Sequence, residues 1–129
     1  MKKAILIIIG LFAMNMAFGQ NKFRVDYNYV AAYDPKTETW GEWQEGDNTF
    51  VININSNGDI AHLKANGETV IYKKLSGVEE GYTDKGYHHY QIIKALDEDG
   101  DVFRFQIFDD KSIGLKMMWG KFMIQFADL

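Results

Sequence analysis

The chain has 129 residues, of which 47% are hydrophobic, and it contains no cysteine. This length and composition allow one domain with a sizeable apolar core, and the lack of cysteine excludes disulfides, thiol nucleophiles and zinc–thiolate sites. The formal net charge is −4, and because no basic stripe offsets the acidic residues, the sequence argues against a nucleic acid as partner.

The first residues have the layout of a secretory signal peptide. Two lysines precede an apolar run over residues 4–14, and the small residues Ala17 and Gly19 stand where a signal peptide is cleaved. We predict a signal peptide over residues 1–19 and one β-barrel-like domain over residues 20–129, with an uncleaved anchor as the alternative. Without the two lysines, 12 basic and 18 acidic residues give a charge of −6. The prediction is an exported bacterial protein, periplasmic or extracellular, with no membrane span after cleavage.

The domain opens with a run whose residues alternate in character, as in a half-buried strand. Its predicted inner stripe is Phe23, Val25, Tyr27, Tyr29, Ala31 and Tyr33. A turn at Asp34-Pro35 then leads to "TETWGEWQ", which we predict to be a second, shorter strand.

Two tryptophans three residues apart belong to this short strand. Trp40 and Trp43 should face opposite sides, so that one enters the core while the other is exposed or covered by a loop. Gly41-Glu42-Trp43 resembles the G-x-W motif that opens lipocalin barrels, in which the tryptophan closes the barrel floor. The resemblance implies a small barrel and specifies no ligand.

Two asparagine–glycine turns organise the next segment. Asn57-Gly58 is a strong signal for a two-residue hairpin, and Asn66-Gly67 continues the same face through Val70 and Tyr72. The first turn pairs apolar residues: Ile54 with Ala61, Ile52 with Leu63, and Phe50 with Ala65. His62 falls on the opposite, polar face.

A polar, glycine-rich segment over residues 76–87 follows and is predicted to be the longest loop, a place where binding residues such as Tyr82 and Tyr87 can lie. A disordered connector is the alternative. His88 and His89 come next and point to opposite faces of a strand, so they cannot hold one metal ion together. His89 is predicted on the inner side, near the barrel mouth.

The acidic stretch "LDEDGDVF" could be a calcium loop or the bend of a hairpin. With Gly100 at the sixth position of an EF-hand loop, the first position is Ala95 and the twelfth is Gln106, so two required ligands are missing. Asp99-Gly100 is a favoured turn pair. We predict a bend with no bound metal, which pairs Ala95 with Phe103 and Ile93 with Phe105.

The last segment is predicted to form two further hairpins. A three-residue loop at residues 109–111 pairs Ile107 with Ile113, Phe105 with Leu115, and Phe103 with Met117. A turn at Trp119-Gly120 then pairs Met117 with Phe122, Leu115 with Ile124, and Ile113 with Phe126. Trp119 would therefore lie at a hairpin tip, beyond the reach of the core.

These elements predict an all-β fold of eight or nine antiparallel strands, mostly an up-and-down meander that closes as a barrel, with a β-sandwich as the alternative.

The sequence contains no catalytic constellation and no cofactor motif. The favoured hypothesis is a non-enzymatic binding or interaction module of the cell envelope. A lipocalin-like barrel that binds an apolar or amphipathic small molecule is the alternative, and a hydrolase-type enzyme is a minor one. The predicted contacts for an unknown protein or small ligand are Trp119, Trp40, Trp43, Tyr82, Tyr87 and His89.

Overall fold

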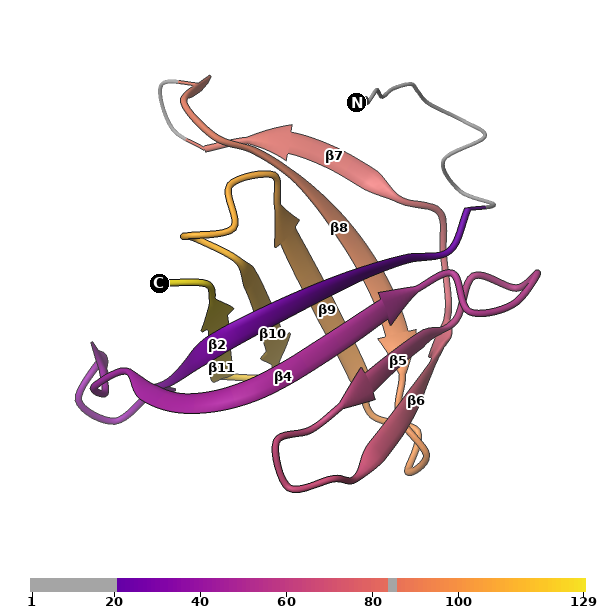
Figure 1. The fold of residues 1–129 in the computed structure, drawn as a ribbon. Helices are drawn as coiled ribbons and strands as arrows, with labels where there is room; N and C mark the ends of the chain where they lie inside the picture. The colour runs from indigo at the N-terminus through magenta and orange to yellow at the C-terminus, as the bar shows by residue number, and fades with distance from the viewer. Residues whose placement is uncertain (1–20, 84–85) are drawn as a thin grey trace.

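The computed structural model describes residues 21–83 and 86–129, and these form ten antiparallel strands (Figure 1). The predicted signal peptide lies outside the described residues. The strands are β2 (Phe23–Asp34), β3 (Thr39–Trp40), β4 (Gln44–Ile52), β5 (Ile60–Leu63), β6 (Thr69–Lys74), β7 (Glu79–Tyr82), β8 (His89–Leu96), β9 (Val102–Phe108), β10 (Leu115–Trp119) and β11 (Phe122–Ala127). Within the described part of the chain, no helix has the length and apolarity needed to cross a membrane.

Eight of the strands close into a barrel. The order runs β11-β10-β9-β8-β6-β5-β4-β2, and β11 pairs with β2 to complete the circle. The predicted barrel is confirmed, and the alternative of a sandwich is wrong. The two remaining strands extend the sheet, since β3 pairs with β2 and β7 pairs with β8.

Strand β7 corrects the prediction of a long loop over residues 76–87. Glu79–Tyr82 pairs with the first half of β8, from Tyr82 opposite His89 to Glu79 opposite Ile92. This short strand projects beyond the barrel and covers little of its core (Figure 1). Its sequence, "EEGY", therefore lacks the alternation of apolar and polar residues by which a half-buried strand is recognised.

The interior of the barrel is filled by large side chains. The fully buried ring of Phe50 makes edge-on contacts with Phe105 and Phe126 at centroid distances of 6.3 Å and 5.0 Å, and Tyr72 meets Phe105 at 4.9 Å. These contacts join β4, β6, β9 and β11 across the barrel. Such ring pairs add stability beyond the area that they bury.

The β8–β9 hairpin has the predicted register. Ala95 lies opposite Phe103 and Ile93 opposite Phe105, and all four side chains are buried. The bend is also as predicted, because the Asp97 N–H donates to the Asp101 carbonyl and Gly100 adopts a φ of 88°. The period-two pattern of this region is therefore confirmed.

The last two hairpins keep the predicted faces but not the predicted partners. Leu115 lies opposite Ile107 and Phe126, whereas the sequence suggested Phe105 and Ile124. The β9–β10 loop is longer than predicted and runs to Gly114, whose N–H donates to the Asp110 carbonyl. Gly114 has a φ of 83°, and a Cβ there would collide with the carbonyl of Phe126. Both register errors are even, so the inner and outer faces are preserved.

Strand β5 is predicted with the wrong face. Ile52 lies opposite Ile60 and Phe50 opposite His62, a displacement of three residues from the predicted pairs. The β4–β5 loop is longer than a two-residue turn because Asn53 adopts a φ of 61° and the Ile54 N–H donates to the Asp59 carbonyl. An odd displacement exchanges the faces of a strand.

The next turn differs from the prediction by one residue. His62, rather than Leu63, lies opposite Val70. The loop holds three residues, because the Lys64 N–H donates to the Glu68 carbonyl. His62 therefore points into the core, and Leu63 is 40% exposed.

The predicted stripe on the first strand is interrupted by a bulge. Tyr27 is buried as expected, but the register of β2 with β4 shifts between Tyr27 and Tyr29. After the bulge Val30, rather than Tyr29, packs against the core, and the Tyr29 hydroxyl reaches Glu45 in an exposed contact. A bulge inserts one residue and so changes which face each later side chain occupies.

His62 is the one imidazole among the described residues that lies within the core. Its ring stacks on Phe50 at 4.2 Å, and its Nε2–H donates to Oδ1 of Asn48 at 2.9 Å. Nδ1 is buried without a hydrogen-bond partner among the described residues. Burial, together with the charge of nearby Lys64, lowers the pKa of His62 to about 4.

The filled interior predicts a large effect of truncating an inward ring. Phe105→Ala should lower the free energy of unfolding by about 3–5 kcal/mol, because Phe105 is fully buried. Gln106→Ala, on the outer face of the same strand, should change it by less than about 1 kcal/mol. Urea unfolding of both variants measures the difference, and equal losses would contradict the assignment of faces.

Burial of a neutral His62 predicts that stability falls in mild acid. The pKa is about 4 in the folded protein and about 6.5 in the unfolded chain, so the unfolded chain binds the proton first as the pH is lowered. This residue alone should remove about 3 kcal/mol of stability between pH 7 and pH 4. Because carboxylates titrate in the same range, the measurement is the stability difference between wild type and His62→Leu at each pH. That difference should shift in favour of the variant by a similar amount, and a pH-independent difference would refute the role of His62.

Candidate functional site

The six predicted contact residues fall into separate places on the barrel. Tyr82, Tyr87 and His89 belong to the β7–β8 end, while Trp119 lies at the opposite end, where β10 turns into β11 (Figure 1). Trp40 is the last residue of β3, and Trp43 lies in the connection from β3 to β4. The six residues therefore belong to three regions rather than to one site.

Trp119 is not at the tip of its hairpin. It is the last residue of β10 and pairs with Phe122, so the turn consists of Gly120 and Lys121. Its ring lies 5.0 Å from Phe103 and packs against the core. The expectation that the core cannot reach Trp119 is wrong, because the displacement by two residues extends β10 to Trp119 and leaves its side chain on the inner face.

Phe122 takes the exposed position that was expected for Trp119. Its ring stacks on Trp119 at 5.7 Å with an angle of 25°, and the residue is 52% exposed. Val102, at the start of neighbouring β9, is 50% exposed. An aromatic ring held this far out of the core is available to a partner.

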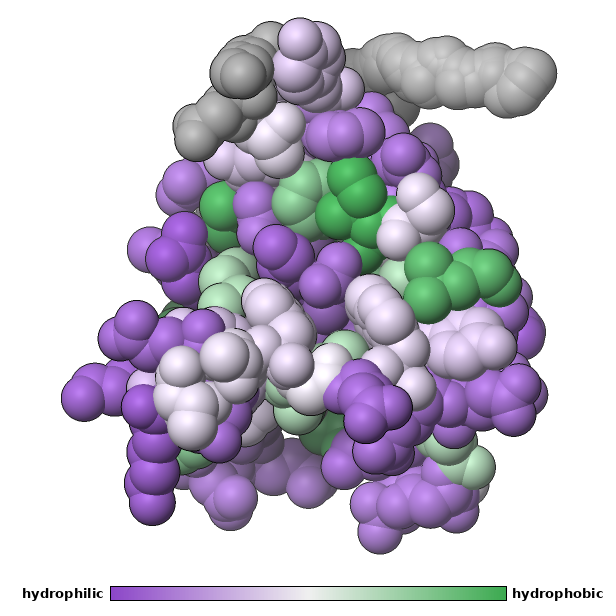
Figure 2. All heavy atoms as spheres, turned by 90° about the vertical axis from the view of Figure 1, so that its left-hand side faces the viewer, coloured by the Kyte–Doolittle hydropathy of each residue, from purple (hydrophilic) through white to green (hydrophobic). Residues whose placement is uncertain are grey.

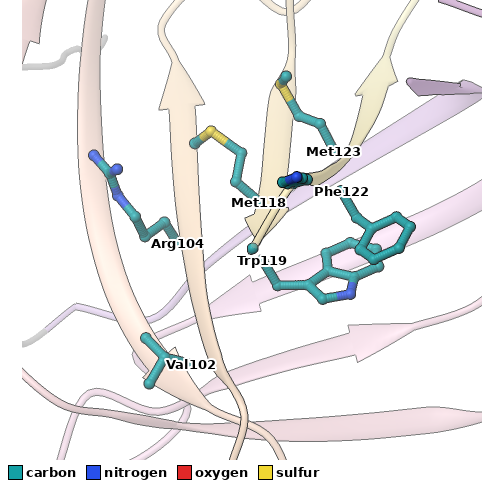
Figure 3. Close-up of a pocket in the computed structure, with 8 residues that line it drawn as sticks. Val102, Arg104, Met118, Trp119, Phe122 and Met123 are labelled. Carbon is teal, nitrogen blue, oxygen red and sulfur yellow. The ribbon is translucent and has the colours of Figure 1, made fainter. Parts of the chain in front are cut away.

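The residues around Phe122 form a partly open hollow of about 380 Å³. We name this surface the β10–β11 rim, and its lining residues are Val102, Arg104, Met118, Trp119, Gly120, Lys121, Phe122 and Met123. Figure 3 shows the rings of Trp119 and Phe122 lying together on one side of the hairpin, while Arg104, Met118 and Met123 extend from the other. The end of this hairpin is thus apolar on both faces.

The rim could have been found in the sequence "MMWGKFM", residues 117–123. In a strand with one wet face, polar residues should alternate with apolar ones. Here Met118 and Met123 occupy outward positions next to inward Trp119 and Phe122. That failure of alternation at a hairpin end is the signal for an exposed apolar surface.

Neither Trp40 nor Trp43, the tryptophan of the lipocalin-like motif, enters the core. Trp40 is 39% exposed and packs edge-on against Tyr33 at 5.4 Å, while the Lys116 ammonium lies 5.9 Å from its ring. Trp43 is 40% exposed. The expectation that one of them is buried is wrong, and Trp43 does not close a barrel floor. Trp40 ends the two-residue strand β3 and Trp43 lies in the connection to β4, so no continuous strand joins them and alternation between them does not apply.

The outer surface seen from the left of Figure 1 offers no broad apolar face. Figure 2 shows small apolar patches there, separated by hydrophilic side chains. A second hollow of about 430 Å³ is lined mainly by polar residues, among them Asn28, Glu45 and Asp47. Both hollows lie outside the packed interior.

At the opposite end of the barrel His89 bridges two carboxylates. Its Nε2 lies 2.7 Å from Glu80 of β7, and its Nδ1 lies 2.9 Å from Asp109 in the β9–β10 loop. Partial burial disfavours the charged ring, but the two hydrogen bonds outweigh it and raise the pKa of His89. Tyr82 packs its ring 5.1 Å from the imidazole. A protonated His89 therefore ties the projecting strand β7 to the β9–β10 loop.

The neighbouring residues of this end lie apart from the His89 bridge. His88 approaches Asp110, with 4.0 Å between Nδ1 and the carboxylate, on the other side from His89. Tyr87 is 76% exposed. Both ring nitrogens of His89 face carboxylates, and these contacts bridge β7 and the β9–β10 loop.

The acidic bend brings three carboxylates within 4.8 Å of one another, from Asp97, Asp99 and Asp101. One of them has a structural role, since Asp97 Oδ1 accepts hydrogen bonds from the N–H groups of Asp99 and Asp101. Through these two hydrogen bonds the Asp97 side chain stabilises the β8–β9 bend.

Comparisons of the chain with models of protein families, with curated proteins and with solved structures found no match.

The bridge at His89 predicts that each carboxylate raises the pKa of the imidazole. Glu80→Gln and Asp109→Asn should each lower the pKa of His89, measured by NMR titration of the ring protons. Asp110→Asn is the matched control, because Asp110 faces His88, and it should leave the His89 titration nearly unchanged. The bridge is refuted if His89 titrates alike in all four proteins.

Proposed function

We propose that this protein is an exported, non-enzymatic binding module of the bacterial cell envelope that contacts its partner through the β10–β11 rim. The observation that carries the proposal is the stacked pair of Phe122 and Trp119, in which the outer ring is half exposed. The export part of the proposal rests on the signal-like residues 1–19 of the sequence.

The packing of the barrel favours a surface contact over an internal ligand. A ligand-binding barrel needs a void of roughly 300 Å³ or more inside it. Here the rings of Phe50, Phe105 and Phe126 meet in the interior, and the two hollows lie outside it. The lipocalin-like alternative is therefore less well supported than a module that binds on its surface.

The surface also favours binding over catalysis. Lys121 and Arg104 flank apolar side chains at the rim, and this hollow contains no carboxylate or imidazole that could serve as a general base. At the other end, the His89 imidazole is held between two carboxylates. The arrangement supports recognition of a partner that has an apolar part.

The proposal predicts that Phe122→Ser weakens partner capture without unfolding the protein. Because Phe122 is 52% exposed, the substitution should change the free energy of unfolding by no more than about 1 kcal/mol. The measurement is recovery of bound material from the envelope fraction of the native cells, by pull-down with wild type and variant followed by mass spectrometry. A circular dichroism melt establishes that the variant is folded.

Tyr87→Ser is the matched control, since it removes a 76% exposed ring at the opposite end of the barrel. It should leave capture unchanged. Loss of capture in Tyr87→Ser with full capture in Phe122→Ser would place the contact at the β7–β8 end and overturn the proposal. Intact mass of the exported protein tests the export part, and retention of residues 1–19 would contradict it.

A further inference from the structure

We infer that the β10–β11 rim, together with the adjoining Lys94, binds a single-chain amphiphile with an anionic headgroup, which Arg104 and Lys94 hold while Met118, Met123 and Val102 cover the chain. This inference rests on the proposed function and names the ligand class for the same surface. It is carried by an arrangement of charges that the fold itself does not require.

The cations stand in one row across the sheet. Lys94 of β8 lies directly opposite Arg104 of β9, Arg104 lies opposite Met118 of β10, and Met118 lies opposite Met123 of β11. The side chains of one such row point to the same face of a sheet. Two positive charges and two flexible apolar side chains are therefore neighbours on the outer face of the barrel.

The positive pair is unfavourable for the isolated protein. Like charges directly opposite each other on adjacent strands destabilise the pair. Both side chains are exposed, and neither Lys94 nor Arg104 forms an ion pair with any described residue. By contrast, Lys116 on the same face lies over the rings of Trp40 and Phe108. An anion between Lys94 and Arg104 would relieve the repulsion, and the guanidinium can bind a phosphate or carboxylate through two parallel hydrogen bonds.

The apolar part of the ligand is indicated by what adjoins the cations. Met118 and Met123 follow Arg104 in the row, and the hollow continues to Val102 and Phe122 at the hairpin end. Methionine side chains adapt to irregular apolar ligands. The hollow of about 380 Å³ is within the range of small-molecule sites, so it suits one chain rather than a large surface.

A bilayer fits this surface less well than a single amphiphile does. The β8–β9 bend lies at the same end of the barrel and carries Asp97, Glu98, Asp99 and Asp101 (Figure 1). These carboxylates would approach the negative headgroups of a membrane together with the rim, and the chain as a whole is acidic. A single amphiphile at the rim meets Arg104, Lys94, Lys121 and the adjoining apolar side chains, and no carboxylate lines this hollow.

Calorimetric titration of the purified protein with dodecyl phosphate, below its micelle concentration, tests the inference. We expect one bound molecule per protein, and at least tenfold weaker binding of inorganic phosphate and of dodecyl maltoside, which lack the chain and the charge respectively. Arg104→Gln and Lys94→Gln should each reduce the affinity for dodecyl phosphate at least tenfold. Lys36→Gln, which removes the same charge from the exposed β2–β3 turn, should not.

A second readout separates binding from structure. Without ligand, Arg104→Gln and Lys94→Gln should melt at the same temperature as wild type or higher, because each removes the repulsion. Equal binding of dodecyl maltoside, or unchanged affinity in Arg104→Gln, would overturn the inference. So would binding to phosphatidylglycerol vesicles without binding of monomeric dodecyl phosphate. If dodecyl phosphate does not bind but Phe122 is still required for partner capture, the inference fails and the proposed function stands.

Discussion

Filling of the barrel interior by aromatic rings is the constraint on which the rest of this structure depends. Phe50 touches Phe105, Phe126 and His62, and these contacts hold strands from both halves of the chain around one centre. A chain without disulfides needs such a core for its stability. The same packing leaves little room for a ligand inside, and for this reason the proposed contact lies on the outer face and at the ends of the strands.

The sequence predicts the correct inner face of a strand where the register is displaced by an even number of residues, and the wrong face where the displacement is odd. At the β9–β10 and β10–β11 turns the predicted registers were displaced by two residues, so Leu115 and Met117 still pointed inward. At the β4–β5 turn the displacement was three residues, which brought His62 into the core and left Leu63 exposed. Fold class and closure follow from alternation, which tolerates even errors. The exact neighbours follow from loops such as Asn53–Asp59, whose left-handed residue and hydrogen bonds are not apparent from local sequence.

The displaced registers also explain why the sequence predicts only part of the candidate site. The sequence identified Trp119 as an unusual residue near a hairpin end, but the two-residue displacement makes Trp119 the inner ring and Phe122 the outer one. The partners of His89 could not be predicted, because Glu80 belongs to a strand that has no alternation and Asp109 to a loop of unpredicted length. Lys94 and Arg104 could have been recognised, since the predicted register of β8 with β9 already places them opposite each other.

The two ends of the barrel illustrate opposite uses of charge. At the β7–β8 end the His89 ring lies between two carboxylates, so the charge of its protonated form is balanced within the fold and helps to hold β7 in place. At the rim Lys94 and Arg104 repel each other, and no described residue compensates them. Folding alone favours replacing one of this pair by a neutral residue, at no loss of packing because both side chains are exposed. An arrangement that costs stability and adds nothing to the core is better explained by a bound anion, since only the complex contains the charge that makes it favourable.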